Sequence, residues 1–129
     1  MTFSDDIRKC RDGVVRNPYQ GTDKKVLFVC SMGILRSATA ARIYGRKYNT
    51  RSAGSWDDAL IPITPILMAW ANEIVFVNNE NYKSVRNRLN DEHINFDKEF
   101  NVKVLNIPDK YPHMHPELIK AFEEQYEPL

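Results

Sequence analysis

The sequence contains only two cysteines, Cys10 and Cys30, and no long apolar run. Two cysteines exclude a disulfide framework and also the four-ligand set of a structural zinc site. No apolar stretch approaches the roughly 20 residues that span a bilayer, and the polar residues 1–6 lack the apolar core of a secretion signal. We therefore expect a cytoplasmic protein without a membrane partner.

The sequence also lacks an excess of positive or negative charge. Eighteen Lys and Arg residues face seventeen Asp and Glu residues, which leaves a formal net charge of +1. Such a balance gives no global field that would attract nucleic acid, so we expect no nucleic-acid partner. Any site for an anion has to be built locally.

The 129 residues, 43% of them hydrophobic, suit one domain with its own core. Short apolar segments predict strands, of which the first has the composition of a strand buried on both faces. The four predicted strands are 25–30, 50–54, 74–77 and 102–107. Residues 1–24 precede the first strand as a polar lead, and we expect an N-terminal extension there, with residues 25–129 as the domain.

Helical patterns alternate with these strands. One begins at Ser37, and a second begins at Thr64 and Pro65, a hydroxyl cap followed by proline at the first helical position. A third helix is capped by Asn78 or Asn79, and a fourth opens at Pro116. The inner faces are predicted to carry Ile66, Leu67, Trp70, Tyr82, Val85, Leu89, Leu118, Ala121 and Phe122.

This alternation predicts an α/β fold with a four-stranded parallel sheet and helices on both of its faces. Ligands of such sheets bind beyond the carboxyl ends of the strands. Cys30 and Asp109 both follow predicted strands. We therefore look for the site around these two residues.

Cys30 is separated by five residues from Arg36 and Ser37, which begin a predicted helix. A loop of this length can turn its backbone N–H groups inward, and the helix N-terminus adds positive potential. The planar guanidinium of Arg36 can donate two parallel hydrogen bonds to phosphate. The predicted binding residues for a phosphate or sulfate ion are Ser31, Met32, Gly33, Ile34, Leu35, Arg36 and Ser37.

The same positive surroundings favour the thiolate of Cys30, which is the nucleophilic form, and Ser37 can donate a hydrogen bond to its sulfur. A free cysteine at a strand end is, taken alone, usually a small buried core residue. The conjunction of strand, cysteine, five-residue gap, Arg-Ser and helix favours catalysis instead. We predict Cys30 and Arg36 as catalytic residues.

These residues resemble the low-molecular-weight protein tyrosine phosphatases, whose signature is a strand, Cys, five residues, Arg-Ser and a helix. The resemblance covers roughly residues 25–126 and is closest to a small, compact branch of that family. Further similar segments are Arg51-Ser52-Ala53-Gly54, residues 70–77, Ile107-Pro108-Asp109-Lys110-Tyr111 and residues 114–119.

The resemblance implies a phosphotyrosine phosphatase I-like sheet in the order 2-1-3-4. It implies hydrolysis without metal or cofactor, a phosphocysteine intermediate, and an aspartic acid from a late loop. A phenolate leaving group needs a proton, and Asp109 is the carboxyl best placed to give it, although Pro-Asp is also common in ordinary turns. The implied substrate is a phosphotyrosine-containing protein or a small phosphomonoester.

Tyr111, with Met32 and Ile34, is a candidate wall around a flat aromatic ring, and a core or exposed position is the alternative. His113 and His115 flank Met114, but two histidines are weak evidence for a metal, and His115 is expected to cap the last helix. We predict no metal site.

The chain departs from the common family pattern at two loop positions. Gly33 stands where an asparagine is usual, and Leu35 stands where a second cysteine often occurs. Glycine can adopt the left-handed backbone that asparagine often takes, but it offers no side-chain bonds to stiffen the loop. Reduced activity is one expected consequence.

Two other functions remain open. The predicted fold also resembles that of thiol-dependent arsenate reductases. The relay cysteines of those enzymes follow the loop, whereas Cys10 precedes it. A non-catalytic phosphate-binding module is the other alternative, because the loop asparagine is missing and the acid is uncertain. It predicts saturable phosphate binding without turnover.

The absence of a neighbouring thiol predicts how the site responds to oxidants. Unless Cys10 approaches it, oxidised Cys30 has no partner with which to form a protective disulfide. We expect peroxide to inactivate the protein irreversibly. Recovery of activity after treatment with a reducing agent would contradict this expectation.

Overall fold

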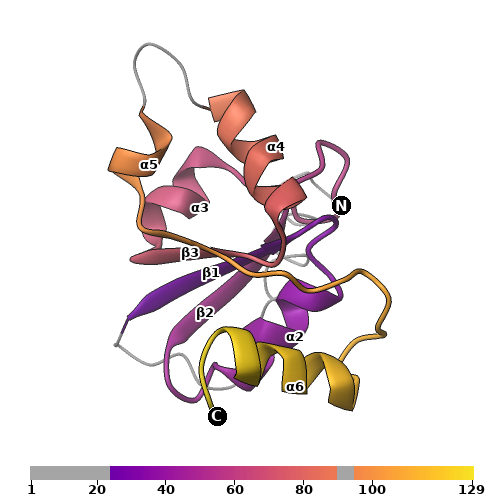
Figure 1. The fold of residues 1–129 in the computed structure, drawn as a ribbon. Helices are drawn as coiled ribbons and strands as arrows, with labels where there is room; N and C mark the ends of the chain where they lie inside the picture. Colours follow the sequence, from indigo (N-terminus) through magenta and orange to yellow (C-terminus); the bar gives the residue numbers. More distant parts are fainter. Residues whose placement is uncertain (1–23, 90–94) are drawn as a thin grey trace, which may run out of the picture.

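The computed structural model describes residues 24–89 and 95–129. Four strands and five helices lie in this part of the chain (Figure 1). In chain order they are β1 (Lys25–Cys30), α2 (Arg36–Ile43), β2 (Asn49–Gly54), α3 (Pro65–Trp70), β3 (Glu73–Phe76), α4 (Asn79–Leu89), α5 (Phe96–Glu99), β4 (Val102–Val104) and α6 (Pro116–Gln125).

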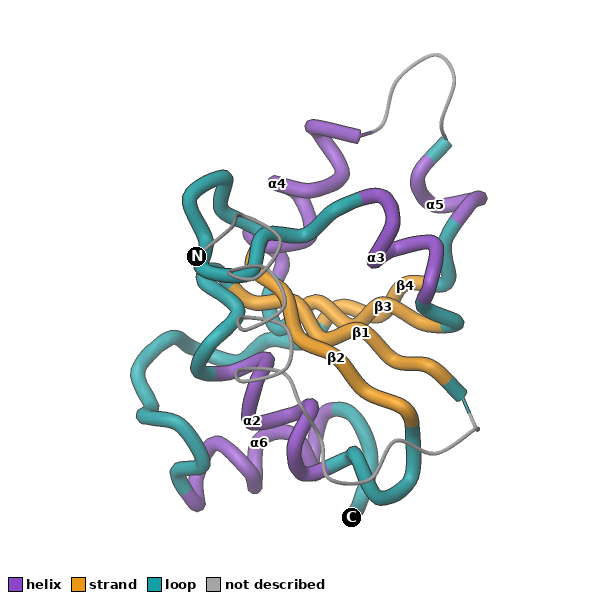
Figure 2. The backbone as a smooth tube through the Cα atoms, turned by 180° about the vertical axis from the view of Figure 1, so that it is seen from behind, coloured by secondary structure: helices purple, strands orange, loops and turns teal. Residues whose placement is uncertain are grey.

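The four strands form one parallel sheet in the order β2-β1-β3-β4, as predicted. Figure 2 shows α2 and α6 on one face of the sheet and α3, α4 and α5 on the other. The chain leaves β1 through α2 to reach β2 on one side, and later enters β3 on the other side of β1. The order therefore reverses beside β1, which is where open α/β sheets hold their ligands.

Each face of the sheet has its own apolar core. On the side of α2 and α6, Phe28 of β1 stacks on Tyr44 at 5.7 Å between ring centroids and meets the edge of Phe122. On the other side, Leu27 and Val29 pack with Phe76 and residues of α3, α4 and α5. Alternate residues of β1 thus enter opposite cores, which confirms the prediction of a strand buried on both faces.

The predicted helix caps are largely confirmed. Thr64 accepts a hydrogen bond from the backbone N–H of Leu67 at 3.2 Å, and Pro65 is the first helical residue. Asn78 caps α4 through the N–H of Asn81 at 2.9 Å. His115 caps α6 by accepting from Glu117 at 3.1 Å, as expected. None of the described helices has both the length and the apolar character needed to cross a membrane.

Three details of the predicted elements were wrong. Ile66 is 83% exposed, whereas Met68 is the buried side chain of α3 and the predicted inner residues Leu67 and Trp70 pack against the core. β4 ends at Val104, although Ile107 still donates a backbone hydrogen bond to Val77 at 2.9 Å. The short helix α5, capped by Asn95, was not predicted.

A buried carboxylate ties the amino end of the sheet to α6. Glu73 is 2% exposed and accepts hydrogen bonds from Tyr126 at 2.6 Å and from Lys24 at 3.1 Å. Lys103 lies 3.6 Å from the same carboxylate. Burial alone raises the pKa of Glu73, but these hydrogen bonds and charges outweigh burial and hold the pKa below its usual value of 4.5.

We predict that Glu73→Gln lowers the free energy of unfolding by about 1–3 kcal/mol near neutral pH, because Lys24 and Lys103 lose their partner. A depressed carboxylate pKa stabilises the fold above the unfolded value and loses this effect as pH falls through the folded value. The cost of the substitution should therefore shrink in acid. Urea unfolding at neutral pH and at acidic pH measures it, with the exposed Glu124→Gln as control. An equal cost at both pH values would contradict the charge-based account.

Candidate active site

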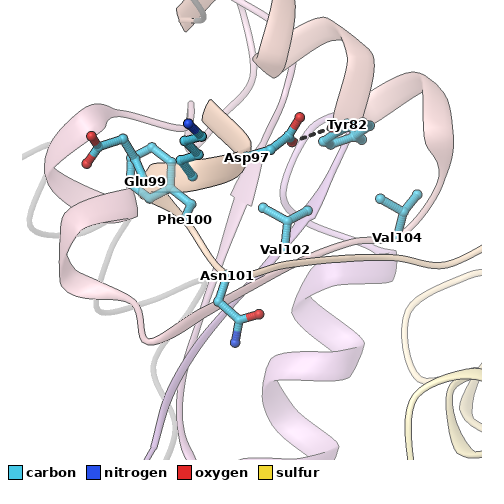
Figure 3. A pocket seen from close by; sticks show the side chains of 8 residues that line it. Tyr82, Asp97, Glu99, Phe100, Asn101, Val102 and Val104 are labelled. Atoms are coloured by element: carbon cyan, nitrogen blue, oxygen red, sulfur yellow. Dashed lines mark hydrogen bonds between the residues drawn. The ribbon is translucent and has the colours of Figure 1, made fainter. Parts of the chain in front are cut away.

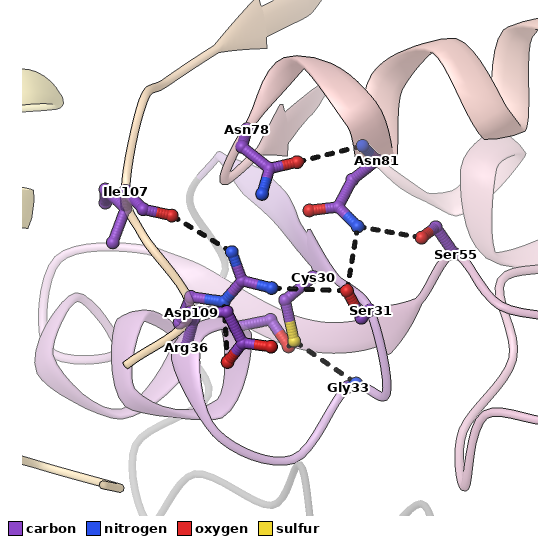
Figure 4. A network of polar contacts seen from close by, with 10 residues as sticks. Cys30, Ser31, Gly33, Arg36, Ser55, Asn78, Asn81, Ile107 and Asp109 are labelled. Carbon is purple, nitrogen blue, oxygen red and sulfur yellow. Dashed lines mark hydrogen bonds and ion pairs between the residues drawn. The ribbon is translucent and has the colours of Figure 1, made fainter. Parts of the chain in front are cut away.

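The loop between β1 and α2 curls around the sulfur of Cys30. The backbone N–H of Gly33 donates to Cys30 Sγ at 3.2 Å (Figure 4). Ser37 Oγ lies 3.0 Å from the same sulfur. Cys30 is 3% exposed and Ser37 is fully buried. The predicted contact between Ser37 and Cys30 is therefore present, and the thiol lies at the bottom of the loop among hydrogen-bond donors.

Arg36 extends its side chain along the other side of this loop. It is 2% exposed, and its guanidinium donates from Nη1 to Ile107 O at 3.0 Å and from Nη2 to Ser31 Oγ at 3.2 Å. Its Nε lies 3.7 Å from Asp109 Oδ1, in an ion pair whose carboxylate is 57% exposed. The sequence predicted that Cys30, Arg36 and Asp109 belong to one site, and the structure places them together (Figure 4).

The segment that carries Asp109 is anchored at both ends. Ile107 is held by Arg36 and by Val77, the residue that follows β3. At the other end, the backbone N–H of Met114 donates to Thr39 Oγ1 at 2.9 Å, and His113 Nδ1 lies 3.3 Å from the same oxygen. Met114 has a φ of +63°, a conformation that is costly for a side chain of this size. Thr39 of α2 thus fixes the segment beside the loop, a role that sequence reasoning missed.

Two glycines allow the loop to lie directly against the end of β2. Gly33 has a φ of +85°, and a Cβ there would lie 2.9 Å from backbone atoms of Ala53 and Gly54. A Cβ on Gly54 would lie 2.6 Å from backbone atoms of Ser31 and Met32. Ser52 Oγ donates to Gly33 O at 3.1 Å, which holds the left-handed turn in place. The expected left-handed backbone at Gly33 is confirmed.

The N-terminus of α2 differs from those of the other helices. Side chains cap α3, α4, α5 and α6, whereas no side chain of residues 24–89 or 95–129 caps α2. The first residues of α2, Arg36 to Ala38, are buried. Free backbone N–H groups at a buried helix N-terminus favour an anion there.

Asn81 of α4 is a further buried polar residue of the site that sequence reasoning missed. It is 3% exposed, and its Nδ2 donates to Ser31 Oγ at 3.3 Å and to Ser55 Oγ at 2.9 Å. A signal was present in the sequence: Asn78, Asn79 and Asn81 follow a predicted strand, at the edge of the sheet where ligands bind.

The other predicted site residues differ in their exposure and packing. Met32 and Ile34 are half-buried and Leu35 is 39% exposed. Tyr111 is half-buried, packs against the core on the α2 and α6 side, and stacks on His115 at 5.4 Å between ring centroids. Its role as a wall for a substrate ring stays a prediction. No group of three potential metal ligands occurs within residues 24–89 and 95–129.

A pocket of about 570 Å³ lies at the β4 edge of the sheet (Figure 3). Across it, Tyr82 donates a hydrogen bond to Asp97 at 2.6 Å. The pocket shares no residue with the loop 30–36 or with the segment 107–109, and it contains no cysteine. It is lined by Tyr82, Asp97, Lys98, Glu99, Phe100, Asn101, Val102 and Val104.

The close approach at Gly33 leads to a test of the loop. Gly33→Ala should lower the free energy of unfolding by about 1–3 kcal/mol, because alanine resists the left-handed backbone and its Cβ meets the backbone of β2. Urea unfolding measures the loss. Unchanged stability would show that the loop relaxes without strain.

In comparisons with protein-family models, curated proteins and solved structures, none matches this chain.

Proposed function

We propose that this protein is a cysteine-dependent phosphomonoester hydrolase, most specifically a protein tyrosine phosphatase that works through a phosphocysteine intermediate. Cys30 is the proposed nucleophile, Arg36 and the loop N–H groups bind the phosphoryl oxygens, and Asp109 is the acid and then the base. The resemblance of the sequence to low-molecular-weight protein tyrosine phosphatases motivates the specific activity, and the geometry of the loop supports the chemistry.

The observation that carries the proposal is the burial of the Arg36 guanidinium beside the Cys30 thiol. A buried cation is costly unless an anion pairs with it. Among the described residues, its one ion-pair partner is Asp109, at 3.7 Å and more than half exposed. A phosphate dianion in the loop would supply the missing negative charge, together with acceptors for the free N–H groups of α2.

In the first proposed step, the Cys30 thiolate attacks phosphorus. The bond from sulfur to phosphorus forms while the bond from phosphorus to the ester oxygen breaks, and Asp109 gives its proton to the departing oxygen. Arg36 and the loop N–H groups stabilise the charge on the three other oxygens. Asp109 is placed for this role because it lies beside the loop and its carboxyl is open to solvent.

In the second step, water attacks the phosphocysteine. Asp109, now ionised, accepts a proton from that water, the new oxygen–phosphorus bond forms, and the sulfur leaves with the bonding electron pair. Ser37 Oγ, at 3.0 Å from the sulfur, can donate a hydrogen bond to the departing thiolate. Phosphate is released, and Cys30 returns to its starting form.

Hydrolysis of para-nitrophenyl phosphate in the presence of EDTA tests the proposal. Cys30→Ser should lower kcat by a factor of about a thousand or more, because the nucleophile is lost. Asp109→Asn should lower kcat by about a hundredfold, because an amide cannot donate the acidic proton. Vanadate should compete with the substrate.

Asp58→Asn is the matched control, because Asp58 is an exposed acid in a different loop and should leave kcat unchanged. Circular dichroism and phosphate binding establish that each variant is folded. A Cys30→Ser protein that keeps wild-type turnover would refute the proposal. Folded wild-type protein that binds phosphate without turnover would favour the phosphate-binding module.

A further inference from the structure

The side chain of Asn81 makes its hydrogen bonds in the site through its nitrogen. Nδ2 donates both of its recorded hydrogen bonds, one to Ser31 and one to Ser55. Its oxygen Oδ1 is buried and has no hydrogen-bond partner in the part of the chain that the structure describes. Buried polar atoms without partners are uncommon, and they need an explanation such as a functional role. Figure 4 shows the amide of Asn81 between α4 and the side of the loop that carries Ser31.

The contacts of Ser31 determine where its hydroxyl hydrogen can point. A serine hydroxyl has two acceptor lone pairs and one hydrogen. Arg36 Nη2 at 3.2 Å and Asn81 Nδ2 at 3.3 Å both donate to Ser31 Oγ. The two donors occupy the two lone pairs, so the hydrogen must donate in a third direction. Ser31 is thereby fixed as a donor, at the edge of a loop that is already rich in donors.

We propose that the Ser31 hydroxyl donates a hydrogen bond to the phosphoryl group and that Asn81 is the positioning residue that orients it. This inference rests on the proposed function. Arg36 Nη2 contacts the same hydroxyl, so an anion oxygen bound by Nη2 lies within reach of Ser31. The Asn81 amide and the Arg36 guanidinium thus both donate to the hydroxyl oxygen of Ser31.

Asn81 matters most when the anion is bound. A bound anion draws the Nη2 group toward itself and away from Ser31, because a charged acceptor binds guanidinium more strongly than a hydroxyl does. Ser31 then keeps Asn81 as its remaining donor. Ser55 fixes the other N–H of the amide at 2.9 Å, so the amide cannot turn away without losing a second bond.

The pair also accounts for how a loop with glycine at position 33 is kept stiff. Gly33 contributes no side-chain bond to the loop. Ser31 is the loop residue next to Cys30, and the bond from Asn81 ties it to the beginning of α4. The stiffening side chain comes from another element of the fold.

The test measures the inhibition constant of inorganic phosphate and kcat/KM with para-nitrophenyl phosphate. Ser31→Ala and Asn81→Ala should each raise the inhibition constant and lower kcat/KM by about tenfold, as expected for a hydrogen bond to a charged group. The double variant should resemble Ser31→Ala, because Asn81 acts through Ser31. Ser31→Thr, which keeps a hydroxyl, should recover most of the loss.

Asn79→Ala is the matched control, since Asn79 is an exposed asparagine in the same turn of α4. If Asn81→Ala does not fold, the Ser31→Ala and Ser31→Thr variants still test the inference, because Ser31 is only half-buried. This inference would be overturned by an unchanged inhibition constant in Ser31→Ala, or by additive losses in the double variant. The proposed function would still stand in that case, provided that the wild-type protein hydrolyses the ester. A wild-type protein that neither hydrolyses the ester nor binds phosphate would overturn both.

Discussion

The buried positive charge of Arg36 is the constraint on which the carboxyl edge of the sheet depends. A guanidinium has five N–H donors, and among the described residues two hydrogen bonds and one long ion pair engage part of them. The bond to Ile107 joins residues 71 positions apart in the sequence. It draws the chain that follows β4 toward the loop that follows β1, and it thereby places Asp109 beside Cys30.

The loop around Cys30 owes its shape to backbone contacts more than to its own side chains. Gly33 and Gly54 permit an approach that any Cβ would prevent. Ser55 N donates to Cys30 O at 2.7 Å and Trp56 N donates to Ser31 O at 3.1 Å, so the segment after β2 continues the hydrogen bonding of the sheet along the loop. In these contacts the loop contributes its carbonyl groups and not its N–H groups.

Much of the fold could be predicted from the sequence because local signals agree. The apolar run of β1, the Thr64-Pro65 opening and the spacing from Cys30 to Arg36 each indicate a local structure, and together they give the sheet and the position of the loop. Asn81 could not be assigned a role in this way, because its partners Ser31 and Ser55 lie 50 and 26 residues away. Periodicity also does not show which turn of a short helix touches the sheet, so Ile66 was placed wrongly.

The buried charges at the two ends of the sheet differ in how completely they are paired. We connect the paired end with stability and the other end with the proposed function. At the amino end, Glu73 has a tyrosine and two lysines as partners, and its negative charge is fully compensated. At the carboxyl end, Arg36 is equally buried but has one exposed carboxylate at longer range. An amino end with paired charges can hold β3, β4 and α6 together without a ligand. Among the described residues, the carboxyl end has a helix without a side-chain cap and a cation with one distant carboxylate, and an anion bound in the loop would complete its pairing. The proposed reaction supplies such an anion in its substrate, in its intermediate and in its product.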